Sequence, residues 1–225
     1  MRTALFLLTL LLTLTGCYRN IQPAGPSASA VSAEDSKKAF LSWSERNVYG
    51  RFDDYELQEL THEEKMSLIE QIKVADGVRY VWGGENPDTG LDCSGLIIWA
   101  YGSLGLKGFR KDENVVYDVT AHEMFTYSAA SLSAMADTRE LLSYDTGDLL
   151  FFDMNSDGRI DHVSVFISFD QASDTVQVWD ASTNTGMVAL REIKNILTKN
   201  PLIGKPMKLV LKGEGRLSVN RPHMP

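Results

Sequence analysis

The order of elements along the chain predicts an α+β protein built on an antiparallel sheet. Residues 62–75 and the stretch that begins at Cys93 have the apolar pattern of helices, whereas from Gly147 onward the pattern is that of short strands. Helices followed by a run of neighbouring strands are typical of the α+β class. We expect N-terminal helices and a central cysteine-bearing helix to pack on the sheet.

The first 33 residues have the composition of an export signal followed by a tether. Arg2 precedes an apolar run from Ala4 to Leu12 that is too short to span a bilayer as a helix. The run ends in Leu14-Thr15-Gly16-Cys17, which resembles a bacterial lipobox. This implies a signal peptide over 1–16 and lipidation of Cys17; an ordinary signal peptide with an incidental cysteine is the alternative. Residues 17–33, rich in Pro, Ser, Ala and Gly, predict a lipid-anchored flexible tether.

The acyl anchor, the residue after Cys17 and the net charge indicate where the protein lies and which partners it has. An acyl-anchored protein is held at a membrane without a spanning segment. Tyr18 stands where lipoproteins retained at the inner membrane often have Asp, and this resemblance implies an outer-membrane protein of the cell envelope that faces the periplasm. The formal net charge of −8 argues against a nucleic-acid partner. The chain has two cysteines, so lipidation of Cys17 would leave Cys93 as its free thiol, without an intramolecular disulfide.

The remaining chain predicts one folded domain with extensions. We expect a helical extension over 34–65, a single domain over 66–212 and a polar tail over 213–225. Thr61 and Glu64 have the spacing of a capping box, which predicts the start of the helix over 62–75.

The elements that follow differ in character. The helix that begins at Cys93 is apolar on nearly all sides, which predicts a helix buried at the centre of the fold. A further helix is expected over 131–142. Strands are expected over 148–152, 162–167, 175–180, 187–190 and 207–211.

Cys93 is the predicted nucleophile. The loop after Tyr80 delivers it to a helix start, where unpaired backbone N–H groups and the helix dipole favour a thiolate. Of the four histidines, His162 stands at the first position of an apolar strand, just after a turn, where its side chain can reach a helix packed on the sheet. The residues therefore predict a Cys93 nucleophile with His162 as its base; a structural hydrogen bond of His162 is the alternative.

Four linked segments carry a family resemblance. They are Tyr80-Val-Trp-Gly-Gly, Gly90 to Leu96, Gly147 to Phe152 and Asp161 to Phe166. In order and spacing they resemble the motifs of the NlpC-type cell-wall cysteine peptidases, and the likeness covers roughly residues 66–212. The resemblance implies a papain-like fold, cleavage of peptidoglycan stem peptides and no cofactor.

The same resemblance implies roles for individual residues. Cys93 would be the nucleophile and His162 the general base and acid. Asp180 stands where the family has a third polar residue, often His; an aspartate can orient the imidazole, and an ordinary strand-end Asp is the alternative. Tyr80 would join the backbone N–H of Cys93 in an oxyanion hole, with a core aromatic as the alternative. The flanking Asp92 and Ser94 would serve loop structure and substrate contact.

The resemblance implies that the protein is a cysteine endopeptidase. Its expected substrate is a peptide or isopeptide bond between D-glutamate and a diamino acid. Two alternatives remain. One is an N-acetylmuramoyl-L-alanine amidase on the same fold. The other is a cell-wall-binding or assembly lipoprotein without turnover, although a binder would not need both Cys93 and His162.

An acidic segment that precedes His162 partly matches a calcium-binding loop. Asp153, Asn155, Asp157 and Asp161 match positions one, three, five and nine of an EF-hand loop, but Ser164 replaces the glutamate at position twelve. A polar hairpin turn is therefore the favoured prediction and a weak calcium site the alternative. Zinc is not expected, because one free cysteine and four scattered histidines lack ligand spacing.

Overall fold

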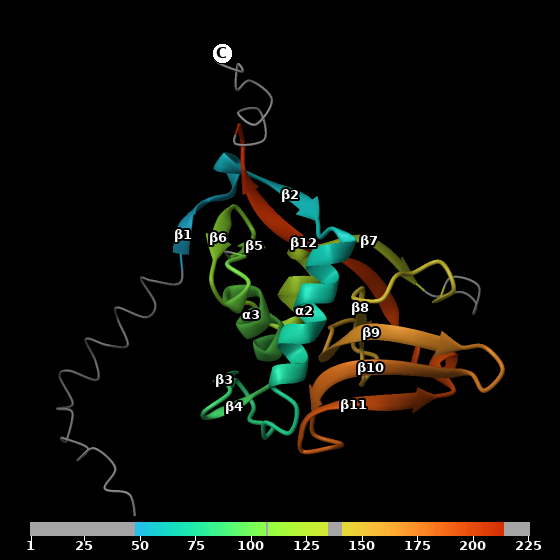
Figure 1. The fold of residues 1–225 in the computed structure, drawn as a ribbon. Helices are drawn as coiled ribbons and strands as arrows, with labels where there is room; N and C mark the ends of the chain where they lie inside the picture. Colours follow the sequence, from blue (N-terminus) through green and yellow to red (C-terminus); the bar gives the residue numbers. More distant parts are fainter. Residues whose placement is uncertain (1–47, 107, 135–140, 214–225) are drawn as a thin grey trace, which may run out of the picture. The chain divides into compact units, whose positions relative to one another are not determined.

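The computed structural model describes residues 48–106, 108–134 and 141–213. All of them belong to one compact unit, residues 40–225 (Figure 1). The predicted signal peptide, Cys17, the tether and the tail from residue 214 lie outside the described residues. In the described part of the chain, no helix is long and apolar enough to cross a membrane.

The described residues form helices and helical turns in the first two thirds of the unit, with strands between them, and a run of strands with one helical turn after them. The helices and helical turns are η1 (Phe52–Asp54), α2 (His62–Val74), α3 (Cys93–Ser103), α4 (Ala121–Glu123), η2 (Met124–Ser128) and η3 (Ile196–Lys199). The strands are β1 (Val48–Arg51), β2 (Tyr55–Glu59), β3 (Glu85–Asn86), β4 (Gly90–Leu91), β5 (Phe109–Lys111), β6 (Asn114–Val116), β7 (Ala129–Ala134), β8 (Leu149–Phe152), β9 (His162–Asp170), β10 (Thr175–Ser182), β11 (Met187–Lys194) and β12 (Leu202–Leu211).

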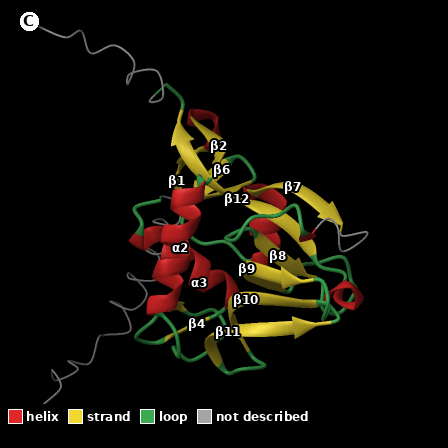
Figure 2. Cartoon of the chain, turned by 45° about the vertical axis from the view of Figure 1, so that its right-hand side comes forward, coloured by secondary structure: helices red, strands yellow, loops and turns green. Residues whose placement is uncertain are grey.

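The main sheet is antiparallel throughout its described part and runs in the order β11-β10-β9-β8-β12-β2, with β7 also paired to β12 (Figure 2). Its register places Phe152 opposite His162 and Asp180 opposite Ala189. The strands β8 to β11 follow one another in the chain and in the sheet, as the sequence predicted. The α+β prediction is confirmed.

One face of this sheet packs on the helices, and α2 and α3 lie side by side against each other (Figures 1 and 2). Leu96 and Ile97 of α3 share one buried cluster with Val163, Val165 and other strand residues. Eight of the eleven residues of α3 are buried, so the predicted central helix is confirmed. This packing fixes the axis of the helix that begins at Cys93.

The other face of the sheet has its own buried cluster, which includes Phe166, Val178 and Ile193. Side chains alternate between the faces of a strand, so His162 and Asp180 project on this second face. His162 opens β9 and Asp180 lies near the end of β10. The two polar side chains therefore meet at the rim of the sheet.

The helical extension predicted over 34–65 is wrong in its described part. Residues 48–51 and 55–59 are strands, and a helix begins only at His62. Charged residues hid the alternating pattern of β2, which pairs with the second half of β12, for example Leu57 with Leu209. The helix α2 itself is confirmed with its capping box, since the backbone N–H of Thr61 donates to Glu64 Oε2 at 2.9 Å.

The helix predicted over 131–142 is wrong in its first part, whereas Leu141, near its predicted end, is helical. Residues 129–134 form β7, in which Ser133 pairs with Ile203 of β12. Residues 135–140 lie outside the described residues. Small residues such as Ala and Ser have no strong pattern of their own, so pairing with β12 decides the conformation.

Candidate active site

Cys93 is the first residue of α3, as predicted, and Asp92 is its N-cap. The backbone N–H of Gly95 donates to Asp92 Oδ1 at 2.7 Å, and the N–H of Gly83 donates to Oδ2 at 2.8 Å. Ser94 Oγ also donates to Oδ1, at 3.1 Å. The carboxylate thus caps the helix and ties the preceding loop to it, which holds the 7% exposed Cys93 in place.

Two glycines let this loop touch the helix start. The backbone N–H of Asp92 donates to the carbonyl oxygen of Gly84 at 2.9 Å. A methyl group added to Gly95 would lie only 2.0 Å from the same oxygen. No side chain fits between the two backbones, so the loop and the start of α3 form one rigid piece.

Asp180 is fully buried and accepts hydrogen bonds from three neighbours. Its Oδ2 lies 2.6 Å from His162 Nε2 and 2.7 Å from Ser164 Oγ. Arg191 Nε lies 2.8 Å from Oδ1, and Arg191 Nη2 lies 2.5 Å from Oδ2. Arg191 pairs with Val178 across β10 and β11, two residues from Asp180 and on the same face. Three adjacent strands therefore orient one carboxylate toward His162.

The pKa values in this network shift in opposite directions. Burial alone lowers the pKa of His162, but hydrogen bonds with Asp180 and Cys93, and the charges of both, outweigh it and raise the pKa to about 9. Burial alone raises the pKa of Asp180, but the bonds with His162 and Arg191 outweigh it and hold the pKa below its usual range. Because Nε2 faces Asp180, Nδ1 is the ring nitrogen left for Cys93. The arrangement favours an imidazolium beside an aspartate that stays ionised.

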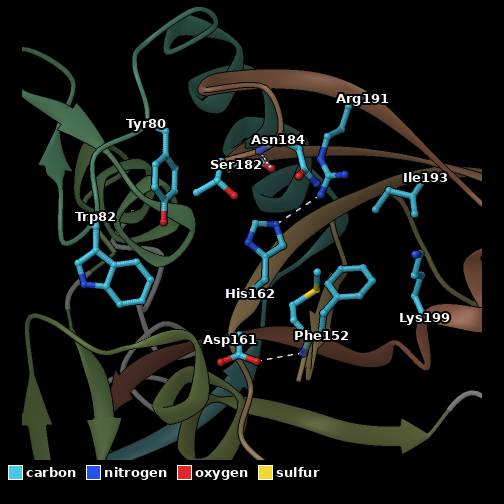
Figure 3. A pocket seen from close by; sticks show the side chains of 12 residues that line it. Tyr80, Trp82, Phe152, Asp161, His162, Ser182, Asn184, Arg191, Ile193 and Lys199 are labelled. Atoms are coloured by element: carbon cyan, nitrogen blue, oxygen red, sulfur yellow. Dashed lines mark hydrogen bonds between the residues drawn. The ribbon is translucent and has the colours of Figure 1, made fainter. Parts of the chain in front are cut away.

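Tyr80 lies across the pocket from His162, with its hydroxyl directed between His162 and Trp82 (Figure 3). Its backbone N–H donates to the carbonyl oxygen of Gly186 at 2.7 Å, which anchors it to the turn between β10 and β11. Burial and the nearby charges of Cys93 and Asp92 raise the pKa of Tyr80. The phenol therefore remains a hydrogen-bond donor at neutral pH.

A cavity of about 390 Å³ opens beside His162. Trp82 and Met154 line it although their side chains are 83% and 65% exposed, respectively. Arg191 and Lys199 line it as well. Exposed apolar groups beside convergent polar ones are typical of a ligand site.

The structure thus brings Cys93, His162, Asp180 and Tyr80 together. Sequence reasoning missed Ser164 and Arg191. The only signal for Arg191 was an arginine on the strand next to that of Asp180, and its use depends on the strand register. Asp92 and Ser94 have the loop role expected of them.

The acidic segment before His162 forms a turn held by its own backbone. The N–H groups of Asp157 and Gly158 donate to the carboxylate of Asp153, at 3.1 and 2.8 Å. Asn155 Oδ1 accepts from Asp157 at 3.1 Å, and Asp161 Oδ2 accepts from Met154 at 3.0 Å. Among the described residues, no group of three or more His, Cys, Asp or Glu side chains is placed to hold a metal ion. The hydrogen bonds of this segment form the polar turn that the sequence predicted.

Comparison with known proteins identifies the family. The model of the NlpC/P60 family matches residues 77–205, more than half of the chain, from before Tyr80 to beyond Arg191. The chain belongs to the NlpC/P60 family. Its Cys93 helix and the strands β8 to β11 all lie within the matched region.

Three curated relatives of this NlpC/P60 protein are endopeptidases by name. The probable endopeptidase YafL and the murein DD-endopeptidase MepH, both of Escherichia coli (strain K12), are 36% and 35% identical to it over 46% and 49% of this chain, and over 36% and 34% of their own length. The bifunctional muramidase/DL-endopeptidase CwlT of Bacillus subtilis (strain 168) is 29% identical over 59% of this chain and 33% of its own. The chain thus spans about a third of the length of the curated relatives it matches.

Solved structures are similar at lower identity. A lipoprotein-like protein of the NLP/P60 family from Staphylococcus aureus subsp. aureus Mu50 is 18% identical with a TM-score of 0.43, over 67% of this chain and 42% of that one. The NlpC/p60 domain of the peptidoglycan hydrolase SagA is 18% identical with a TM-score of 0.41, over 64% and 98%.

Proposed function

We propose that this NlpC/P60 protein is a cysteine endopeptidase that hydrolyses peptide or isopeptide bonds in peptidoglycan stem peptides. The observation that carries the proposal is the network at the sheet rim: the fully buried Asp180 lies 2.6 Å from His162 Nε2, and Cys93 at the first turn of α3 is near enough to His162 to help raise its pKa. A nucleophile, a base and a group that orients the base are the parts that acyl transfer needs. The names of the three curated relatives support an endopeptidase, and two of them name the bond class.

In the proposed mechanism Cys93 attacks the scissile carbonyl as a thiolate paired with the His162 imidazolium. His162 then donates its proton to the leaving amine, and the C–N bond breaks to give an acyl-enzyme on Cys93. A water molecule that gives its proton to His162 hydrolyses this thioester. Asp180 holds the ring in one orientation during both proton transfers. Every proton is carried by a residue of this chain, so no cofactor is invoked.

The oxyanion of the tetrahedral intermediate needs hydrogen-bond donors that face the former carbonyl oxygen. We assign this role to the backbone N–H of Cys93 and the hydroxyl of Tyr80. Tyr80 suits it because its raised pKa keeps the proton on the phenol. Asp92 and Ser94 are proposed to contact substrate beside the nucleophile, in addition to their role in the loop.

The bond we propose joins D-glutamate to a diamino acid, as the family resemblance implies. The relatives name two bond classes, since MepH is a DD-endopeptidase and CwlT a DL-endopeptidase. When either bond is cut in a stem that contains a diamino acid, the leaving amine belongs to the diamino acid. Product masses distinguish the two bonds.

The test is digestion of purified sacculi by the wild-type protein and by Cys93→Ala, followed by mass spectrometry of the released fragments. We expect fragments cut within the stem in the wild-type digest and none above background with Cys93→Ala. Identical fragment profiles for the two proteins would reject the hydrolase. Intact stems released from muramic acid would instead identify the amidase.

We propose that the peptidase domain predicted over residues 66–212, together with β2 and the start of α2 that pack with it, is tethered to the outer membrane through lipidated Cys17. The support is the lipobox-like segment before Cys17 and the composition of residues 17–33. Labelling with an alkyne fatty acid tests it: the wild-type chain should incorporate the label and fractionate with outer membranes. Equal labelling of Cys17→Ser would reject the anchor.

A further inference from the structure

We propose that Arg191 and Lys199 form a subsite for a free carboxylate on the leaving diamino acid. The proposal rests on the proposed function, because it concerns the fragment that departs after His162 donates its proton. It adds a specificity determinant to a pocket whose other residues do the chemistry.

The position of the pocket indicates which part of the substrate enters it. His162 lines the cavity and Cys93 does not. The leaving amine must lie within hydrogen-bond reach of His162 to receive its proton, so the leaving residue lies on the His162 side of the nucleophile. A cavity of about 390 Å³ is large enough for one residue of a peptide.

The charges on the β11 side of the pocket favour an anion. Arg191 uses Nε and Nη2 to bind Asp180, which leaves Nη1 without an acceptor among the described residues. Lys199 is exposed and has no ion pair or hydrogen bond with any residue that the structure describes. Figure 3 shows both side chains directed into the pocket, with the apolar Ile193 between their attachment points. A guanidinium and an ammonium beside an apolar wall suit a carboxylate.

Of the described residues that line this pocket, Asp161 alone has an acidic side chain. It lies on a different edge from Lys199, where it accepts the N–H of Met154 (Figure 3). Its charge suits the ammonium group that every diamino acid carries and therefore does not select among them. The cationic side does select, because diaminopimelate has a carboxylate at its far end and lysine has only a hydrogen there.

The experiment compares two tripeptides, L-Ala-γ-D-Glu-X with X either meso-diaminopimelate or L-lysine. They differ in one carboxylate. Binding is measured by calorimetry on the Cys93→Ala protein, so hydrolysis does not interfere. We expect the diaminopimelate peptide to bind about tenfold more tightly. Adding Lys199→Gln should lower this preference to about threefold, since an exposed ammonium contributes modestly.

Lys194→Gln in the same background is the matched control, because Lys194 is an exposed lysine of β11 that does not line the pocket. It should leave the preference at its original value, and all three proteins should melt at the same temperature. Equal affinity for the two peptides, binding of neither, or an unchanged preference in Lys199→Gln would overturn the subsite. Sacculus digestion separates the two proposals: a diaminopimelate preference without hydrolysis rejects the peptidase alone, and hydrolysis without a preference rejects the subsite alone.

Discussion

The two halves of the candidate site are held in place by different means. The nucleophile half, residues 80–95, is held by backbone groups close in sequence, with Asp92 as the cap and Gly84 against Gly95. The base half is held by side chains from three strands, with Arg191 eleven residues from Asp180 and His162 eighteen. A change in volume should therefore damage the first half most, and a change in charge the second.

The largest effect is expected from Gly95→Ala. The new methyl group would lie 2.0 Å from a carbonyl oxygen that cannot move without shifting the loop. Displacing Cys93 by about 1 Å should lower kcat/KM about 100-fold and should also lower the melting temperature.

Gly102→Ala on the same helix is the control. There a methyl group meets only the hydroxyl of Tyr117, at 3.8 Å, which is an ordinary contact. This variant should retain both activity and stability. If Gly95→Ala also retained full activity, the rigid contact would not position the nucleophile.

The next largest effect is expected from Asp180→Asn, which keeps the shape of the side chain and removes its charge. The hydrogen bond to Asp180 helps to raise the pKa of His162 to about 9, so this pKa should fall. Activity that depends on the imidazolium is lost above the pKa of His162. The alkaline limb of the kcat/KM profile should therefore move down from about pH 9. At neutral pH we expect a loss of about tenfold to 100-fold in kcat/KM. An unmoved limb would show that Asp180 does not act on His162.

Arg191→Met should shift the same limb in the opposite direction. Arg191 Nη2 lies 3.5 Å from His162 Nε2, where its positive charge opposes an imidazolium (Figure 3). Its removal should raise the pKa of His162 and move the alkaline limb upward, with a loss of about tenfold in activity because Asp180 loses an anchor. Arg191→Lys, which keeps the charge, should leave the limb near its wild-type position. If the alkaline limb moved in the same direction in Asp180→Asn and Arg191→Met, the two charges would not have opposite effects on the pKa of His162.

The smallest effect concerns stability near the nucleophile half. Burial, together with Asp118 and Asp92, raises the pKa of Glu85 to about 7. The folded state therefore binds a proton more tightly than the unfolded state, and stability should fall as the pH rises from about 4.5 through about 7. Glu85→Gln should flatten this dependence by about 1 kcal/mol in thermal unfolding. Glu192→Gln, an exposed carboxylate of β11, is the control and should leave the slope unchanged.

The contrast between the halves also explains what could be predicted from the sequence. The capping box of α2, the buried α3 and the position of Cys93 at a helix start depend on residues within a few positions of one another. The strands β8 to β11 could be predicted because each has its own apolar run. Arg191 and Ser164 were missed because their contact with Asp180 depends on strand register. The strands β2 and β7 were missed for the same reason, since both depend on pairing with β12.

The most direct test of the account is the rate at which iodoacetamide alkylates Cys93 at about pH 6. His162, whose pKa is about 9, is then protonated and can pair with a thiolate. We expect Cys93 of the wild-type protein to react at least about tenfold faster than a free thiol such as glutathione, and this advantage to disappear in His162→Ala. Wild-type labelling no faster than glutathione would contradict the Cys93–His162 pair and favour a binding protein without turnover.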